Sequence, residues 1–140
     1  MSARFFLDTN IFVYSCDVRY PAKKEKARKL IAEALEKDSG IISFQVVQEF
    51  LSVATKKFQN LMSTDEARLY LNEVLEPLCE VFPSMELYRQ ALEIADDHKT
   101  SLYDSLILAS AGQAGCKLVY SEDFQNGQKI RGLTIQNPFH

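Results

Sequence analysis

The stretch that decides the fold is FFLDTNIFVY, residues 5–14. Its first three residues predict a buried strand, but Asp8 interrupts the apolar run, which then resumes. A buried carboxylate without a partner is costly, so an acid here serves packing poorly. It serves an active site well, because open α/β sheets bind their ligands at the carboxyl ends of the strands. Asp8 therefore needs partners from other segments of the chain.

The composition is that of an ordinary globular protein, with 46% hydrophobic and 25% charged residues. A length of 140 residues predicts a single domain, 1–140, that buries a full core. The net charge is −3, so the surface as a whole does not favour nucleic acid. A nucleic-acid substrate therefore requires a local basic patch.

The cysteines and histidines restrict the chemistry further. Cys16, Cys79 and Cys116 are widely spaced and form neither a zinc pattern nor a disulfide framework, which favours a reducing compartment. The only histidines are His98 and His140, too few for a histidine-based metal site. Asp8 cuts the first apolar run below signal-peptide length, and no stretch is long enough to span a membrane. We expect a cytoplasmic protein without a membrane partner.

Strand and helix patterns alternate along the chain. Strands are expected at residues 3–7, 41–42, 79–82, 117–121 and 133–135. Helices are expected at residues 11–16, 20–37, 44–58, 63–75, 85–97 and 102–114. The fourth helix is expected to stop before Pro77, and Ser43 is expected to cap the third. Such alternation predicts an α/β fold with a parallel sheet and helices on both faces.

Four acids occupy comparable places in this pattern. Asp8 and Asp123 directly follow apolar strands, which places both at the carboxyl edge of a parallel sheet. Glu49 lies on the third helix, at the border of its apolar arc. Asp104 lies on helix 102–114, whose apolar residues surround it on nearly every side and predict a central, buried position.

Each acid also has an ordinary structural interpretation. Asp8 is a possible helix cap, and Asp104 follows Ser101 at capping-box spacing. Glu49 fits a boundary position whose carboxylate reaches solvent, and Asp123 fits a turn. For a single acid the structural interpretation is the more probable one, and the functional hypothesis depends on the set.

Taken together, four acids at one edge without a neutralising Lys or Arg repel one another. A hard divalent cation bound through oxygen relieves this repulsion, and Mg²⁺ or Mn²⁺ suits an all-carboxylate site. Such a site best supports metal-assisted phosphoryl transfer to water. The role of helix cap then falls to Thr9 and Asn10 rather than to Asp8.

The motifs around these acids resemble those of the PIN-domain ribonucleases. They are LDTNI at residues 7–11, S-x5-EF at 43–50, YDSLI at 103–107 and YSEDF at 120–124. The resemblance covers the whole chain in order, and the branch most similar in these motifs is the VapC-type toxins of bacterial and archaeal toxin–antitoxin pairs. It implies a PIN-like three-layer α/β/α fold with a central, mostly parallel sheet of about five strands. It also implies Mg²⁺- or Mn²⁺-dependent endonucleolytic cleavage of RNA, a homodimer, and inhibition by a small antitoxin protein.

The resemblance also assigns roles to residues. Asp8, Glu49 and Asp104 carry over as metal-binding, catalytic acids. The fourth is either Glu122 or Asp123, and Asp123 fits the family's S/T-x-D position better. In the resulting hypothesis three aspartates hold one or two metal ions, and Glu49 is a further ligand or orients the attacking water. The residues that match supporting polar positions are Thr9, Asn10 and Ser121.

The acidic composition makes RNA binding a separate question. The candidate contacts to the RNA backbone are Lys23, Lys24, Lys26, Arg28, Lys29, Lys56, Lys57 and Arg131. For the first five, a solvated helix face is an equally good interpretation.

Three other functions remain open. One is a non-catalytic PIN-like module that binds RNA or a protein, for which four converging acids are unnecessary. Another is a PIN nuclease of RNA processing that has no antitoxin. The third is a phosphotransfer domain with Asp8 as nucleophile, which lacks the D-x-D pattern and the lysine of such sites.

Overall fold

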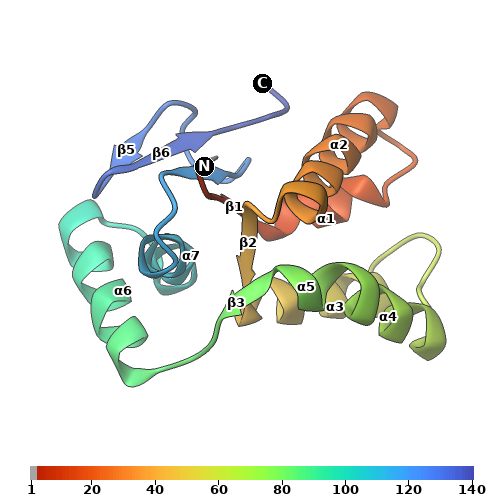
Figure 1. The fold of residues 1–140 in the computed structure, drawn as a ribbon, viewed down its shortest axis with the longest axis horizontal. Helices are drawn as coiled ribbons and strands as arrows, with labels where there is room; N and C mark the ends of the chain where they lie inside the picture. Colours follow the sequence, from red (N-terminus) through yellow and green to blue (C-terminus); the bar gives the residue numbers. More distant parts are fainter. Residues whose placement is uncertain (1–2) are drawn as a thin grey trace.

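The computed structural model describes residues 3–140, and within them six short strands form one sheet (Figure 1). The strands are β1 (Phe5–Leu7), β2 (Gly40–Ser43), β3 (Cys79–Val81), β4 (Leu118–Tyr120), β5 (Lys129–Ile130) and β6 (Leu133–Gln136). Their order in the sheet is β3-β2-β1-β4-β6-β5. All neighbours are parallel except β5 and β6. The predicted α/β class with a central, mostly parallel sheet is confirmed.

The sixth strand, β5, was not expected from the sequence. It has only two residues, too few to show a strand pattern, and it pairs antiparallel with β6. Arg131 and Gly132 join the two strands and have φ angles of 51° and 81°. Two consecutive positive φ angles in a two-residue loop are typical of a type I′ hairpin turn.

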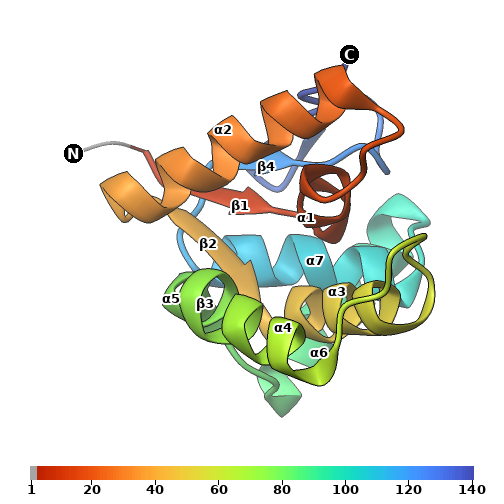
Figure 2. The same ribbon diagram turned by 90° about the vertical axis from the view of Figure 1, so that its right-hand side faces the viewer.

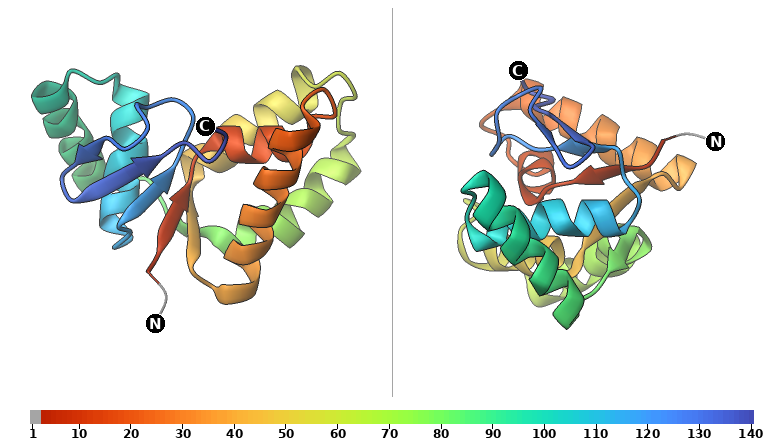
Figure 3. Two further views of the ribbon diagram at one scale, coloured as in Figure 1. Left: turned by 90° about the horizontal axis from the view of Figure 1, so that it is seen from above. Right: turned by 90° about the vertical axis from the view of Figure 1, so that its left-hand side faces the viewer.

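Helices cover both faces of the sheet and produce the expected three layers. They are α1 (Thr9–Ser15), α2 (Pro21–Lys37), α3 (Phe44–Lys56), α4 (Thr64–Tyr70), the π-helical turn η1 (Leu71–Leu75), α5 (Glu76–Leu78), α6 (Met85–His98) and α7 (Leu102–Gln113). Figure 2 shows α2 on one side of β1 and β4 and α7 on the other. Seen from above, α1 and α2 lie on the opposite side of β1 from α6 and α7 (Figure 3).

The core lies on both sides of β1. Every residue of β1 and β2 is buried, as expected for parallel strands covered by helices on two faces. Residues 105–111 of α7 are also buried, which confirms the central position predicted for that helix. Phe6, Phe12 and Phe50 are among the largest side chains that are fully enclosed.

Two local predictions were wrong. The helix that was expected to stop before Pro77 continues through η1 and α5 to Leu78. Pro77 stands in the first turn of α5, where its missing N–H costs least, and the π-helical turn before it accommodates the irregularity. Ser43 does precede α3, but its hydroxyl makes no cap bond and finds no partner among residues 3–140.

Among the described residues, no helix combines the length and apolar character that a membrane span requires.

The contact between α2 and β2 depends on the absence of a side chain at Gly40. A methyl group there would collide with the Cβ of Ala34 and lie 2.9 Å from its Cα. Gly40→Ala is therefore expected to lower the free energy of unfolding by about 2 kcal/mol, measured by urea denaturation. Gly112→Ala is the matched control, because no described neighbour lies within 4 Å of the added methyl group. It is expected to be neutral or stabilising by up to about 1 kcal/mol, and equal losses in both variants would contradict this explanation.

Candidate functional site

The carboxyl ends of three adjacent parallel strands meet at one edge of the sheet. Leu7 of β1 is in register with Tyr120 of β4, so Asp8 and Ser121 follow them side by side. The backbone N–H of Asp8 donates to the carbonyl of Tyr120 at 3.0 Å, which continues the ladder by one residue. On the other side of β1, β2 ends at Ser43 and leads directly into α3.

Asp8 is held rigidly in this position. Its side chain is 4% exposed, and both carboxylate oxygens accept hydrogen bonds. Oδ1 accepts from the backbone N–H of Thr9 at 2.7 Å, and Oδ2 accepts from the hydroxyl of Ser121 at 2.7 Å. Asp8 is itself the N-cap of α1, so the assignment of that role to Thr9 and Asn10 was wrong. Asp8 thus follows the end of β1 directly, and its carboxylate caps the start of α1.

Ser121 and Asn10 organise the turn after β4. The Ser121 hydroxyl accepts from the backbone N–H of Asp123 at 3.1 Å while it donates to Asp8. The side-chain oxygen Oδ1 of Asn10 accepts from the backbone N–H of Glu122 at 3.4 Å. Two of the three supporting residues named from the sequence therefore connect the first strand–helix turn with the turn that carries Asp123.

The remaining acids reach the same edge from helices. Glu49 lies on α3 and Asp104 lies in the first turn of α7, capped by the Ser101 hydroxyl at 3.1 Å. The side-chain amide of Gln45 donates to the carbonyl of Tyr103 at 3.1 Å and joins α3 to the start of α7. Residues Glu49 and Asp123 are exposed, Asp104 is half-buried and Asp8 is buried. We call Asp8, Glu49, Asp104 and Asp123 the acidic edge.

Mutual repulsion within the acidic edge is visible in the pKa values. Burial raises the pKa of Asp8 from 3.8 to about 7, the hydrogen bonds from Ser121 and Thr9 oppose this rise, and the charges of Asp123 and Glu49 add to it. Partial burial of its carboxyl group raises the pKa of Glu49, and the charges of Asp123 and Asp104 raise it further. The charges of Glu49, Asp104 and Asp123 thus each act on at least one other acid of the edge.

Asp123 follows the same pattern. Its pKa is raised first by partial burial of the carboxyl group, although the residue as a whole is exposed, and then by the charges of Asp104 and Glu122. The Asn10 side chain opposes this rise. The four acids predicted from the sequence are therefore brought together by the fold.

Glu122 makes its hydrogen bond and its ion pair with residues outside the acidic edge. Its Oε1 accepts from the hydroxyl of Tyr14 at 2.7 Å, and its Oε2 pairs with the Lys23 ammonium at 3.0 Å. The same ammonium lies 4.5 Å from the centre of the Tyr14 ring. Of the two adjacent acids, Asp123 is the one whose charge acts on Asp8 and Glu49.

Gln45 is a residue of this site that was not identified from the sequence. It is 5% exposed, and its amide oxygen has no hydrogen-bond partner among residues 3–140. The Thr9 hydroxyl, near Glu49, likewise has no partner of good geometry in the described chain. The available signal was spacing, because Gln45 stands one helical turn before Glu49 on the same face.

The donor set was tested against a divalent cation. Within residues 3–140, no three Asp, Glu, His or Cys side chains are close enough together to form a ready-made metal cluster. Mg²⁺, however, usually keeps several water ligands and takes only one or two carboxylates together with substrate phosphates. Carboxylates that raise one another's pKa, beside the unpaired oxygens of Thr9 and Gln45, fit an ion bound in that way.

The buried position of Asp8 predicts a pH-dependent stability. Because its pKa is raised to about 7 in the folded protein, the folded state binds a proton that the unfolded chain has lost. The stability due to the protonated form is present at low pH and is lost as the pH rises through about 7. In EDTA, Asp8→Asn is expected to raise the free energy of unfolding by on the order of 3 kcal/mol at pH 8 and little at pH 4.

The same change at Asp96, whose side chain is 86% exposed, is the control and is expected to show no such trend. The difference in free energy of unfolding between Asp8→Asn and the wild type is therefore expected to change between pH 4 and pH 8. An equal difference at both pH values would exclude a raised pKa for Asp8.

Solved structures share this fold. VapC20 of Mycobacterium tuberculosis, described as a sarcin–ricin loop cleaving toxin, is 20% identical, with a TM-score of 0.62 over 85% of this chain and 89% of that one. A toxin–antitoxin complex from Klebsiella pneumoniae is 18% identical, with a TM-score of 0.66 over 98% of both chains. DNA-bound VapBC from Salmonella typhimurium is 22% identical, with a TM-score of 0.65 over 98% and 99%.

The sequence matches a family model but no individual curated protein. The family model of the PIN domain matches residues 5–127, a range that includes all four acids of the acidic edge. The family predicted from the acidic motifs is confirmed, and the chain belongs to the PIN-domain family.

Proposed function

We propose that this protein is a metal-dependent endoribonuclease that hydrolyses RNA phosphodiester bonds with residues 1–140 acting as one nuclease domain. The observation that carries the proposal is the acidic edge beside the end of β1, where the pKa values of Asp8, Glu49 and Asp123 are raised by burial and by the charges of neighbouring acids. Membership of the PIN-domain family supports a nuclease rather than a phosphotransfer domain.

In this proposal Asp8, Asp104 and Asp123 hold Mg²⁺ or Mn²⁺. Held by these aspartates, the ion would lower the pKa of a water molecule and offset charge on the scissile phosphate. Each Asp8 oxygen already accepts one hydrogen bond, and a carboxylate oxygen has a second lone pair with which to bind an ion. Ser121 and Thr9 therefore fix the orientation of Asp8 without occupying its coordinating capacity.

Glu49 is suited to handle the proton of the attacking water. Its pKa is raised by partial burial and by Asp123 and Asp104, which makes it a better proton acceptor than a solvated glutamate. Gln45, one turn earlier, ties α3 to the start of α7 and so keeps Glu49 and Asp104 at a fixed separation.

Fewer Lys and Arg side chains are free to contact the RNA backbone than the sequence suggested. Lys23 is paired with Glu122, Arg131 with Asp97 and Glu93, and Lys29 with Glu25. Arg28 donates to the Ser15 carbonyl. Within residues 3–140, the candidates with neither an ion pair nor a side-chain hydrogen bond are Lys24, Lys26, Lys56 and Lys57. We propose that RNA contacts come from this smaller set, which is consistent with a net charge of −3.

We further propose that the enzyme is a cytoplasmic homodimer and the toxin of a type II toxin–antitoxin pair. The support is the likeness to a toxin of Mycobacterium tuberculosis and to toxin–antitoxin complexes of Klebsiella pneumoniae and Salmonella typhimurium. The partner is then a small antitoxin protein that suppresses cleavage when bound.

Removal of the Asp8 charge tests the catalytic assignment. Asp8→Asn keeps one oxygen to accept from the Thr9 N–H, and its amide nitrogen donates to the Ser121 hydroxyl in place of accepting from it. It loses the charge that would hold the metal ion, so RNA cleavage is expected to fall by roughly a hundredfold or more. EDTA is expected to abolish cleavage by the wild type, and Mg²⁺ or Mn²⁺ to restore it. Asp65→Asn, at a side chain 92% exposed on α4, is the control. Binding of RNA without cleavage in the wild type would favour a non-catalytic module.

Asp123 and Glu122 allow a second, internal test. Asp123→Asn is expected to lower cleavage by roughly a hundredfold, because it removes a proposed metal ligand. Glu122→Gln is expected to lower it by less than about tenfold, because the glutamine oxygen still accepts from Tyr14 while only the half-buried pair with Lys23 is lost. If Glu122→Gln causes the larger loss, Asp123 is not the fourth acid.

A further inference from the structure

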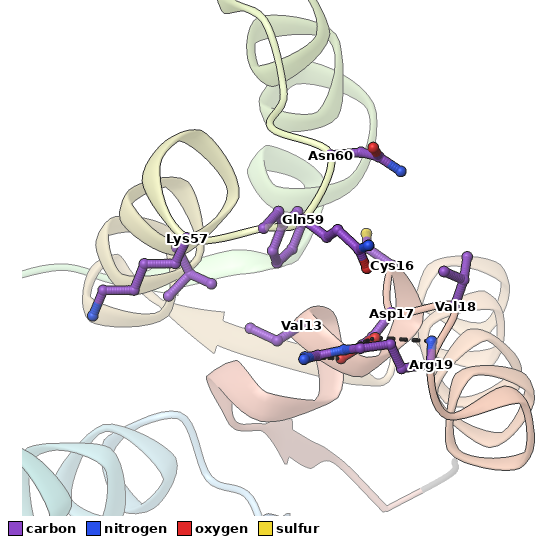
Figure 4. Close-up of a pocket in the computed structure, with 10 residues that line it drawn as sticks. Val13, Cys16, Asp17, Val18, Arg19, Lys57, Gln59 and Asn60 are labelled. Atoms are coloured by element: carbon purple, nitrogen blue, oxygen red, sulfur yellow. Dashed lines mark hydrogen bonds and ion pairs between the residues drawn. The ribbon is translucent and has the colours of Figure 1, made fainter.

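A pocket of about 580 Å³ lies between the end of α1 and the end of α3. Its walls come from α1 with the loop that follows it, and from α3 with the loop that leads to α4. Figure 4 shows Gln59 reaching toward Cys16 from the opposite wall, with Arg19 held across Asp17. The volume falls within the roughly 300–1,000 Å³ typical of small-molecule sites.

The pocket continues the acidic edge along two helices. Thr9 of α1 lies near Glu49 of α3, at the edge itself. One helical turn further along each helix stand Val13 and Val53, and both line the pocket. Four residues of an α-helix advance by about 6 Å. The part of the pocket lined by Val13 and Val53 therefore lies about 6 Å beyond Thr9 and Glu49 along the two helices, an offset comparable to one nucleotide of an extended single strand.

The lining combines three kinds of group. Val13, Val53 and Phe58 form an apolar surface, and Phe58 is fixed edge-on against Phe50 with ring centres 5.9 Å apart. Gln59 adds an exposed side-chain amide that both donates and accepts hydrogen bonds.

Asn60 adds a second exposed amide. Lys57 adds a positive charge that makes no ion pair within the described chain, whereas Arg19 is neutralised by Asp17 at 2.9 Å. An apolar wall, two amides and one free ammonium match a nucleotide, with its flat base, its polar base edges and its phosphate.

We propose that this pocket binds one nucleotide of a single-stranded RNA, the one next to the scissile phosphate at the acidic edge. The base lies against Val13, Val53 and Phe58, its edge meets Gln59 and Asn60, and Lys57 contacts the adjoining phosphate. The proposal rests on the proposed function, because it assigns the substrate position beside that site. It makes the pocket the part of the enzyme that selects the base flanking the cut.

Mononucleotide binding tests the pocket independently of cleavage. AMP, CMP, GMP and UMP are titrated separately into the methyl-labelled protein in EDTA, and the resonances of Val13 and Val53 are followed by NMR. At least one nucleotide is expected to shift both resonances saturably, and inorganic phosphate alone is not. Lys57→Ala is expected to weaken this binding by roughly fivefold. Lys117→Ala, an equal loss of charge at an exposed residue outside the pocket, is expected to leave it unchanged.

The substitutions are chosen so that the fold survives. Lys57 and Asn60 are exposed, whereas Phe58 packs on Phe50 and is left intact. Absence of shifts with all four nucleotides overturns the proposal, as do equal shifts with phosphate alone or equal losses in the two lysine variants. Nucleotide binding by a protein that cuts no RNA supports the pocket and rejects the nuclease.

Cleavage provides the second measurement. In an enzyme that cuts RNA, Asn60→Ala is expected to change the preference for the base beside the cut and to raise KM, with kcat retained. Cleavage with an unchanged KM and base preference in both Asn60→Ala and Lys57→Ala overturns the pocket while the nuclease assignment stands.

Discussion

The hydrogen bond between Ser121 and Asp8 is the interaction on which the site depends. It joins the ends of two neighbouring strands, supplies a partner for a carboxylate that is 4% exposed, and leaves that carboxylate facing the other acids. Two hydrogen bonds oppose the effect of burial on Asp8 but do not cancel it, since its pKa remains raised to about 7. Burial of the Asp8 carboxylate therefore costs free energy that an apolar residue at this position would not cost. Acids kept in such positions are typical of functional sites.

The adjacent acids Glu122 and Asp123 show how one turn serves two purposes. The Glu122 carboxylate forms an ion pair with the Lys23 ammonium. This ammonium also lies near the rings of Tyr14 and Phe139. The charge of Asp123 acts on Asp8 and Glu49, and its backbone N–H is fixed by Ser121. Neutralising the first acid holds the turn in place, and leaving the second unneutralised keeps it available to a cation.

The sequence was sufficient for the fold class, the family and the positions of the acids, because these depend on strong local signals. An acid after an apolar run, as at Asp8, marks a strand end whatever the surrounding packing. The two-residue strand β5 and the helix through Pro77 were missed because their evidence is a turn geometry and a π-helical irregularity, neither of which has a clear periodicity. The role of Gln45 and the pairing of Lys23 depend on contacts between residues distant in sequence, which no local pattern contains.

The sheet order places β1 between β2 and β4, and this has a consequence for synthesis of the protein. Ser121 lies 113 residues after Asp8, and Asp104 and Asp123 also belong to the last part of the chain. Asp8 and Glu49 thus leave the ribosome well before Asp104 and Asp123 have been translated. The central strand lacks its second neighbour until residues 118–120 have been translated. A growing chain that has not reached residue 118 therefore carries Asp8 and Glu49 without Asp123, and it has no assembled acidic edge.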